Sequence, residues 1–181
     1  RPRLSTARLF FALWPDEAVR RQLHKSCRDA VKACGGRPVP ARNYHLTLAF
    51  LGNVAIELLP AIRAAAAELP PPSLELRLDR FGSFPRARVA WIGPGEPAPE
   101  LAGLSQSLWA AMIPLGLDPD VRPFRPHVTI ARNIQREASG EIRREVIWPV
   151  RRFALIRSVT ATEGARYTVD QGFPGGSSNE P

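Results

Sequence analysis

NYHLTLAFLG, residues 43–52, is an apolar, strand-like stretch that carries a histidine near its start. A related stretch, PHVTIAR at residues 126–132, lies in the second half of the chain. In both, an apolar residue, a threonine and a second apolar residue follow the histidine, which gives His45 with Thr47 and His127 with Thr129. The chain has 3 histidines, so two of them occupy one repeated local pattern.

The segments that precede the two motifs repeat as well. Residues 7–14 form an apolar and aromatic run that predicts a buried strand, and residues 16–34 have the 3.6-residue period of an amphipathic helix. A strand at 88–94 and a helix at 99–116 precede the second motif in the same order. The remaining predictions are a helix at 55–69, a strand at 74–81, a loop at 133–145, and an antiparallel pair at 150–159 and 165–173.

Helices that alternate with partly hairpin-linked strands predict an α+β fold. Because strand, helix and motif strand recur, we expect a bilobal, pseudo-twofold duplicated fold. Two antiparallel or mixed sheets then flank a central cleft, and the helices lie on the outside. We expect residues 1–172 to be one catalytic domain of two such lobes, with a mobile C-terminal tail at 173–181 that is rich in Gly, Ser and Pro.

The repeated motif brings groups of acid–base chemistry together. Alternate residues of a strand face the same side, so His45 and Thr47 share one face while apolar neighbours take the core face. His127 and Thr129 do the same on the second strand. Two imidazoles can supply the base and the acid that phosphodiester hydrolysis needs, and threonine hydroxyls can bind the non-bridging oxygens. The pattern therefore predicts a metal-free phosphodiesterase site with no cofactor.

The bulk properties agree with a soluble protein that binds a polyanion. The formal net charge is +8, and all basic residues except two lysines are arginines, which bind phosphate bidentately. No run approaches the length of a membrane span. The N-terminal run lacks a cleavage site and is expected to be folded protein rather than a signal peptide. Cys27 and Cys34 lie too far apart on one helix for a disulfide, and no metal-ligand spacing is present. We expect a cytoplasmic monomer.

The doubled motif and its flanks resemble the two-histidine phosphoesterases, and within them the RNA 2′,3′-cyclic phosphodiesterases, also called 2′-5′ RNA ligase-like proteins. RLFFAL, HLTLAFLG, RVAWIG, RPFRPHVTIAR and RSVTATEGARYTV carry the resemblance over most of the chain. It implies metal-independent opening of a terminal 2′,3′-cyclic phosphate to a 2′-phosphate in a bilobal cleft. In some family members it also implies 2′-5′ joining of RNA ends.

The resemblance also suggests roles for individual residues. It implies that His45 donates the proton to the leaving 3′ oxygen, that His127 activates water, and that Thr47 and Thr129 bind the phosphate. Arg132 matches an arginine that recurs in the family and is a candidate phosphate binder. Strict alternation along the strand points Arg132 away from the cleft, so the strand must end or twist there for this role.

Several other histidine, aromatic and arginine residues are not assigned to the site. His24 is expected on the surface of the first helix, and strand parity puts Phe50 in the core rather than against an RNA base. Arg122, Arg125 and the arginines of 136–152 either line an RNA path or form a solvated face. Two alternative functions stay open. One is the same chemistry on a small nucleotide or ADP-ribose cyclic phosphate, and the other is a non-catalytic module that binds RNA ends.

Overall fold

The computed structural model describes residues 4–175 and contains long antiparallel strands with helices packed against them. The strands are β1 (Thr6–Leu13), β2 (Arg37–Pro38), β3 (Leu46–Ala55), β4 (Leu74–Phe84), β5 (Val89–Gly93), β6 (Val128–Arg132), β7 (Gly140–Val150), β8 (Phe153–Ala161) and β9 (Gly164–Phe173). The helices are α1 (Glu17–Cys34), α2 (Leu59–Ala67) and α3 (Pro99–Met112), with short 3₁₀ turns at Ala41–Asn43, Ile56–Leu58 and Ile113–Leu115. This composition confirms the α+β prediction.

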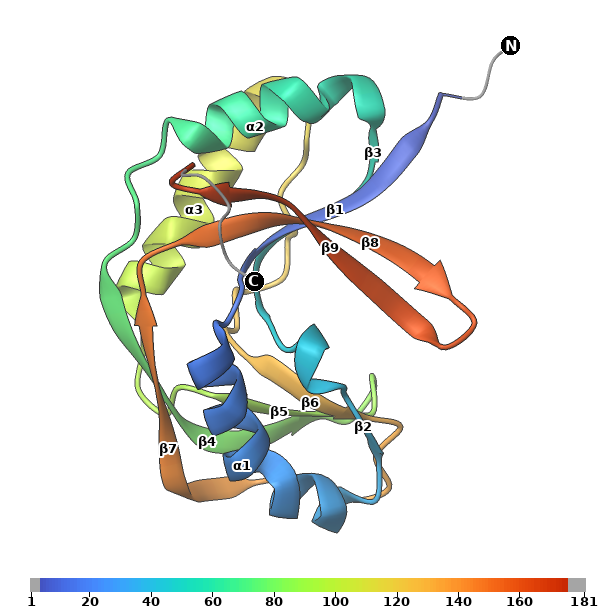
Figure 1. Ribbon diagram of the computed structural model, residues 1–181, viewed down its shortest axis with the longest axis vertical. Coiled ribbons are helices and arrows are strands. Elements are labelled where there is room, and N and C mark those ends of the chain that lie inside the picture. Colours follow the sequence, from blue (N-terminus) through green and yellow to red (C-terminus); the bar gives the residue numbers. More distant parts are fainter. Residues whose placement is uncertain (1–3, 176–181) are drawn as a thin grey trace.

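The strands follow the order β7-β4-β5-β6-β3-β1-β8-β9, and β2 pairs with β6. Each half of this order contains one motif strand, β6 in one and β3 in the other. The two halves are joined where β3 and β6 pair at Leu46 and Val128. The two expected sheets are therefore two halves of one continuous sheet, and they lie at an angle to each other in Figure 1.

Each half of the sheet is covered by its own helices. Figure 1 shows α1 along the half that contains β4, β5 and β7, and α2 and α3 along the half that contains β1, β3 and β8. Helix α1 begins where the Asp16 side chain accepts a hydrogen bond from the Val19 amide at 2.9 Å, and it ends at Gly35, whose φ of 68° is left-handed. Val19, Leu23 and Cys27 form its buried face. One contiguous hydrophobic core runs through both halves.

Two sequence-based expectations about strand ends were wrong. The loop expected at 133–145 contains the start of β7, an edge strand whose pairing with β4 is interrupted at residues 142–145. The consecutive, exposed Arg143, Arg144 and Glu145 in this interruption gave the segment the composition of a loop. Helix α1 covers this edge: the Gln22 side chain bonds both backbone groups of Ile147, and Ser26 donates to the Arg144 carbonyl at 2.9 Å. The helix expected at 55–69 also starts later than predicted, because strand β3 continues through Gly52 to Ala55 and α2 begins at Leu59.

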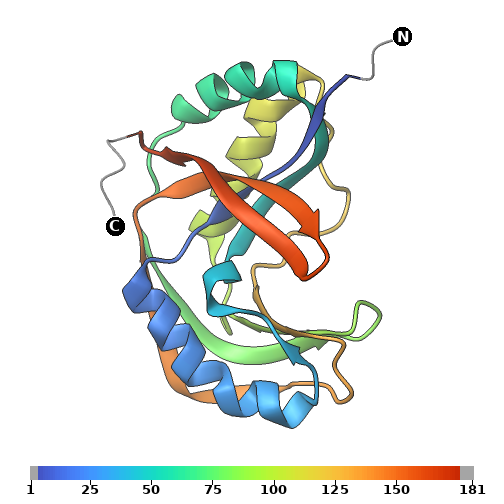
Figure 2. The ribbon, with the colours of Figure 1, turned by 45° about the vertical axis from the view of Figure 1, so that its right-hand side comes forward.

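The ribbon of β8 and β9 extends beyond its neighbours at one side of the motif strands, as Figure 2 shows. Strand β9 ends at Phe173, which is buried. Most of the tail expected to be mobile, residues 176–181, lies outside the described residues, as do residues 1–3. None of the helices within residues 4–175 is both long and apolar enough to cross a membrane.

Candidate functional site

The two histidines lie on either side of the junction between the sheet halves. Leu46 of β3 and Val128 of β6 are direct antiparallel partners, and His45 and His127 each come one residue before them. Thr47 and Thr129 each come one residue after. The pairing therefore brings together all four residues that the doubled motif predicts for the site, although the motifs lie far apart in the sequence.

Each imidazole is oriented by a backbone carbonyl two residues earlier. His45 Nδ1 lies 2.8 Å from the Asn43 oxygen, and His127 Nδ1 lies 2.6 Å from the Arg125 oxygen. A carbonyl can only accept, so this bond assigns the ring proton to Nδ1 in both histidines. Nε2 is then the nitrogen left to exchange a proton with a ligand.

Aromatic rings surround both histidines. The His45 ring centroid lies 5.0 Å from that of Phe10, 5.0 Å from that of Tyr167 and 6.0 Å from that of Trp14. The His127 centroid lies 4.9 Å from that of Phe84 and 6.3 Å from that of Trp91. This packing fixes the ring planes and removes water from much of each imidazole.

Burial lowers the pKa of both histidines. The pKa of His45 is lowered to about 4, and burial of the ring is the largest cause. The charges of Arg132 and His127 lower this pKa further, whereas the hydrogen bond to the Asn43 oxygen raises it. For His127 burial again comes first and Arg132 adds to it, while the bond to Arg125 opposes the lowering. Both rings are therefore neutral at pH 7 in the free protein. The positive charge of Arg132 contributes to the lowered pKa of both imidazoles.

The same irregularity interrupts both motif strands. On β3, Thr47 pairs with Ala12 and Ala49 pairs with Phe11, so Leu48 is an extra residue without a partner. On β6, Thr129 and Ala131 pair with consecutive residues of β5, which leaves Ile130 as the extra residue. A bulge of this kind shifts the alternation by one position. The residue three positions after each threonine, Phe50 or Arg132, therefore returns to the threonine's face.

The bulges correct the expectation for Phe50 and explain the position of Arg132. The Phe50 ring is 38% exposed and lines a pocket together with His45 and Thr47, so its assignment to the core was wrong. Arg132 lies at the end of β6, past the bulge, and is exposed. Simple alternation fails at both positions because a bulge has no unambiguous signature in a single sequence. His24 is exposed on α1, as expected.

Different groups satisfy the carbonyls that the two bulges leave free. The Ser105 hydroxyl on α3 donates to the Leu48 oxygen at 2.6 Å, and the Val39 amide next to β2 donates to the Ile130 oxygen at 2.9 Å. Ser105 is only 5% exposed in an otherwise apolar core. Its burial is explained by this one bond, which fixes the strand beside Thr47.

The pocket beside His45 has a volume of ≈ 420 Å³ and opens between β1, β3, β8 and β9. It is lined by Arg8, Phe10, His45, Thr47, Phe50, Ser158, Thr160, Ala165 and Tyr167. Ser158, Thr160 and Tyr167 were not singled out from the sequence. They come from the β8–β9 ribbon, and only pairing with β1 brings them to the site.

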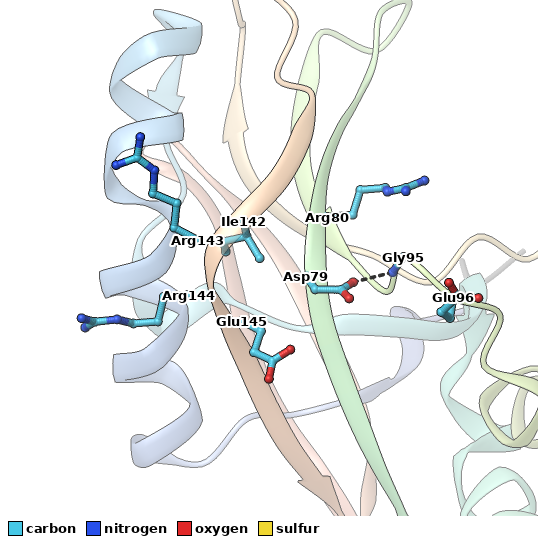
Figure 3. Close-up of a pocket in the computed structure, with 8 residues that line it drawn as sticks. All are labelled: Asp79, Arg80, Gly95, Glu96, Ile142, Arg143, Arg144 and Glu145. Carbon is cyan, nitrogen blue, oxygen red and sulfur yellow. Dashed lines mark hydrogen bonds between the residues drawn. The ribbon is translucent and has the colours of Figure 1, made fainter.

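A second, larger cavity of ≈ 510 Å³ lies between β4, β7 and the loop after β5, and neither histidine lines it. Figure 3 shows the Asp79 carboxylate accepting a bond from the Gly95 amide, while Arg143 and Arg144 extend to the other side of β7. Acids and arginines are mixed around it. No group of three potential metal ligands is found among the side chains that the structure describes, those of residues 4–140 and 142–175. The smaller pocket, which includes His45, is therefore the candidate site.

Comparisons with known proteins identify the family to which this chain is similar. The model of the 2′-5′ RNA ligase superfamily matches residues 11–162. The RNA 2′,3′-cyclic phosphodiesterase of Escherichia coli (strain K12) is 37% identical over 126 residues, which are 70% of this chain and 72% of that protein. The protein of the same name from Thermus thermophilus is 35% identical over 181 residues, covering 92% of this chain and 89% of its own length.

Solved structures extend the similarity to the fold. A crystal structure of E. coli LigT complexed with 3′-AMP superposes with a TM-score of 0.83 at 33% identity, covering 93% of this chain and 98% of that one. A crystal structure of TT0787 of Thermus thermophilus gives a TM-score of 0.76 at 31% identity, covering 92% and 96%.

Proposed function

Since this chain belongs to the 2′-5′ RNA ligase superfamily, we propose that it hydrolyses 2′,3′-cyclic phosphate ends of RNA to 2′-phosphates. Relatives that are 30–37% identical and aligned over most of their own length carry the name RNA 2′,3′-cyclic phosphodiesterase. The observation that carries the proposal is the pair of imidazoles at the β3–β6 junction, each with Nδ1 held by a carbonyl and Nε2 left for chemistry. Residues 1–172 form the catalytic domain.

His127 is the base and His45 the acid. His127 Nε2 takes a proton from water, whose oxygen attacks phosphorus and forms a new P–O bond. The bond from phosphorus to the 3′ oxygen breaks, and that oxygen takes a proton from His45 Nε2. The products are a 2′-phosphate and a free 3′ hydroxyl. Ligation through a 2′-5′ bond, known for some members of the family, would exchange the two roles.

The pocket next to His45 supports this division of roles. It is large enough for a nucleoside and is lined by His45 and Thr47 but not by His127. A terminal nucleoside bound there has its ribose, and therefore the leaving 3′ oxygen, on the His45 side. Attacking water then approaches phosphorus from the His127 side, opposite the leaving oxygen.

The phosphate supplies the charge that the acid needs. In the free protein burial and the charges of Arg132 and His127 keep the pKa of His45 at about 4. A bound phosphodiester brings a negative charge next to the imidazole and pairs with Arg132, and both changes raise the pKa of His45. Thr47 and Thr129 donate to the non-bridging oxygens, and Arg132 balances the charge that grows on them in the transition state.

An exposed aromatic ring in the pocket favours a nucleotide ligand. Phe50 lines the pocket and is exposed, and RNA-binding proteins stack unpaired bases on such rings. A small nucleotide or ADP-ribose cyclic phosphate would use the same histidines, and a non-catalytic RNA-end module would bind without turnover. The experiment below separates the non-catalytic module from the proposal, because only an enzyme turns over the RNA.

The protein acts as a cytoplasmic monomer. Every residue assigned to the site comes from one chain, so no second copy is needed to complete it. Cys27 and Cys34 are free and buried, which fits a reducing compartment.

Phosphorus NMR of a short RNA that ends in a 2′,3′-cyclic phosphate, with EDTA present, tests the function. The wild type should produce a 2′-phosphate. His45→Ala and His127→Ala should each lower turnover by about 10²–10⁴-fold, while His24→Ala, a matched change on the exposed face of α1, should not. Binding without turnover by the wild type would favour the RNA-end module. A 3′-phosphate product, or activity lost to EDTA and restored by a divalent metal, would contradict the proposed chemistry.

A further inference from the structure

A polar row crosses the β1–β8–β9 part of the pocket, beyond the two histidines. Ser158 of β8 pairs with Arg8 of β1 on one side and with Tyr167 of β9 on the other. Directly paired residues of neighbouring strands project to the same face, and all three line the pocket. Thr160, which pairs with Ala165 two residues further along β8, extends the row toward the end of the ribbon.

The charge of this row suits an anion. Within the described residues, the pocket lining contains one guanidinium and the hydroxyls of Ser158 and Thr160 at this end, and no carboxylate. Guanidinium and hydroxyl groups are the side chains that most often hold phosphate oxygens, and arginine does so bidentately. Neither the water nor the cyclic phosphate of the proposed reaction needs a cation this far from His45.

The guanidinium of Arg8 is held beside the base-stacking ring. Its central carbon lies 4.8 Å from the centroid of the Phe50 ring, a cation–π contact that positions an otherwise long and mobile side chain. Phe50 follows Thr47 by three residues with the Leu48 bulge between them, so its ring is about two strand steps, ~7 Å, from the threonine. That distance is on the scale of one nucleotide unit.

We propose that Arg8, together with Ser158 and Thr160, binds the phosphate that links the terminal nucleotide to the one before it. The inference rests on the proposed function, because it takes the terminal nucleoside to lie between His45 and Phe50. Its 5′ side then leads along β1 and β8 to the polar row. The preferred substrate is therefore an RNA of two or more nucleotides rather than a mononucleoside cyclic phosphate.

The test removes each partner of the proposed ion pair in turn: the guanidinium from the protein, and the negative charge of the linking phosphate from the substrate. Two dinucleotides that end in a 2′,3′-cyclic phosphate are compared, one with a phosphodiester linkage and one with an uncharged methylphosphonate linkage. Each is assayed with the wild type, with Arg8→Gln, and with Arg166→Gln, which removes a charge from the opposite face of the same ribbon. A mononucleoside 2′,3′-cyclic phosphate provides the reference turnover.

For the wild type, kcat/KM should be about 10- to 100-fold higher with the phosphodiester than with the methylphosphonate, the range expected for a charge-assisted pair. Arg8→Gln should abolish most of that ratio, and Arg166→Gln should keep it. The slope of log kcat/KM against log salt should become about 0.7 less negative in Arg8→Gln, as expected for one lost phosphate contact on a single strand. A ratio near one in the wild type, or an unchanged ratio in Arg8→Gln, overturns the proposal.

The design separates this inference from the proposed function. If the wild type hydrolyses the mononucleoside reference and shows no linkage ratio, the chemistry stands and the phosphate subsite is rejected. If no substrate is hydrolysed, the proposed function fails, and equilibrium binding of the two dinucleotides to wild type and Arg8→Gln decides the subsite. Tighter binding of the phosphodiester that disappears in Arg8→Gln supports it, and equal binding of both rejects it.

Discussion

Removing the Ser105 hydroxyl should disturb the strand that carries Thr47, because this hydroxyl bonds the Leu48 oxygen. In Ser105→Ala the Leu48 oxygen loses the 2.6 Å bond from a side chain that is 5% exposed, so no water can replace it easily. An unsatisfied buried acceptor costs about 1–3 kcal/mol, and alanine returns a few tenths as the better helix former. The net loss of unfolding free energy should be about 1–2 kcal/mol, or about 2–8 °C in Tm for a chain of this size.

The same substitution at Ser107 provides the matched control. Ser107 lies on α3 as well but is exposed, so Ser107→Ala experiences the helix-propensity change without the lost bond. Urea unfolding and thermal melts of both variants should therefore separate the contribution of the hydrogen bond to the free energy of unfolding from that of helix propensity. Because Leu48 directly follows Thr47, kcat should also fall about tenfold or more in Ser105→Ala when the bulge relaxes.

The outcome that refutes this reasoning is equal behaviour of the two variants. If Ser105→Ala is as stable as Ser107→Ala and turns over substrate at the same rate, the bulge does not depend on the hydroxyl. A drop in stability with unchanged kcat would show that the bond stabilises the core without positioning Thr47.

Three further outcomes are expected. The pKa of His45 is about 4 in the folded protein against 6.5 for the free side chain, so the unfolded chain binds more protons between these two pH values. The free energy of unfolding should therefore fall by up to about 3 kcal/mol as the pH is lowered through that range. Urea unfolding from pH 7 to 4 should show a smaller fall for His45→Gln than for the wild type. Phe50→Ala should lower kcat/KM for a dinucleotide about tenfold through lost stacking, Phe50→Tyr should retain it, and equal losses in both would argue against stacking. Gly82→Ala would place a methyl group against the ring of Trp91, which packs on His127, so this variant should have a lower turnover and a lower Tm. Gly103→Ala, at a position with open space around it, should change neither turnover nor Tm for the worse.

Local pattern was sufficient for most of the secondary structure. The apolar period of α1 and the run of β1 predicted both elements to within one residue at each end, because a helix face or a buried strand needs only the correct spacing of apolar side chains. The start of β7 was missed for the converse reason. Its consecutive charged residues lie where the pairing with β4 is interrupted and have the composition of a loop. Only the pairing on either side and the bonds to α1 identify the segment as a strand.

The sequence by itself determined the doubled motif on which the proposed chemistry rests: two histidines with matching threonines, each on an apolar strand. Tertiary structure decided which neighbours join them. The bulges at Leu48 and Ile130 return Phe50 and Arg132 to the face of the two threonines, and the β8–β9 ribbon adds its own polar and aromatic residues. A bulge depends on cross-strand pairing and on a distant donor such as Ser105. The interactions that stabilise the bulge therefore come from residues that are remote in sequence, so the local sequence around the bulge does not predict it.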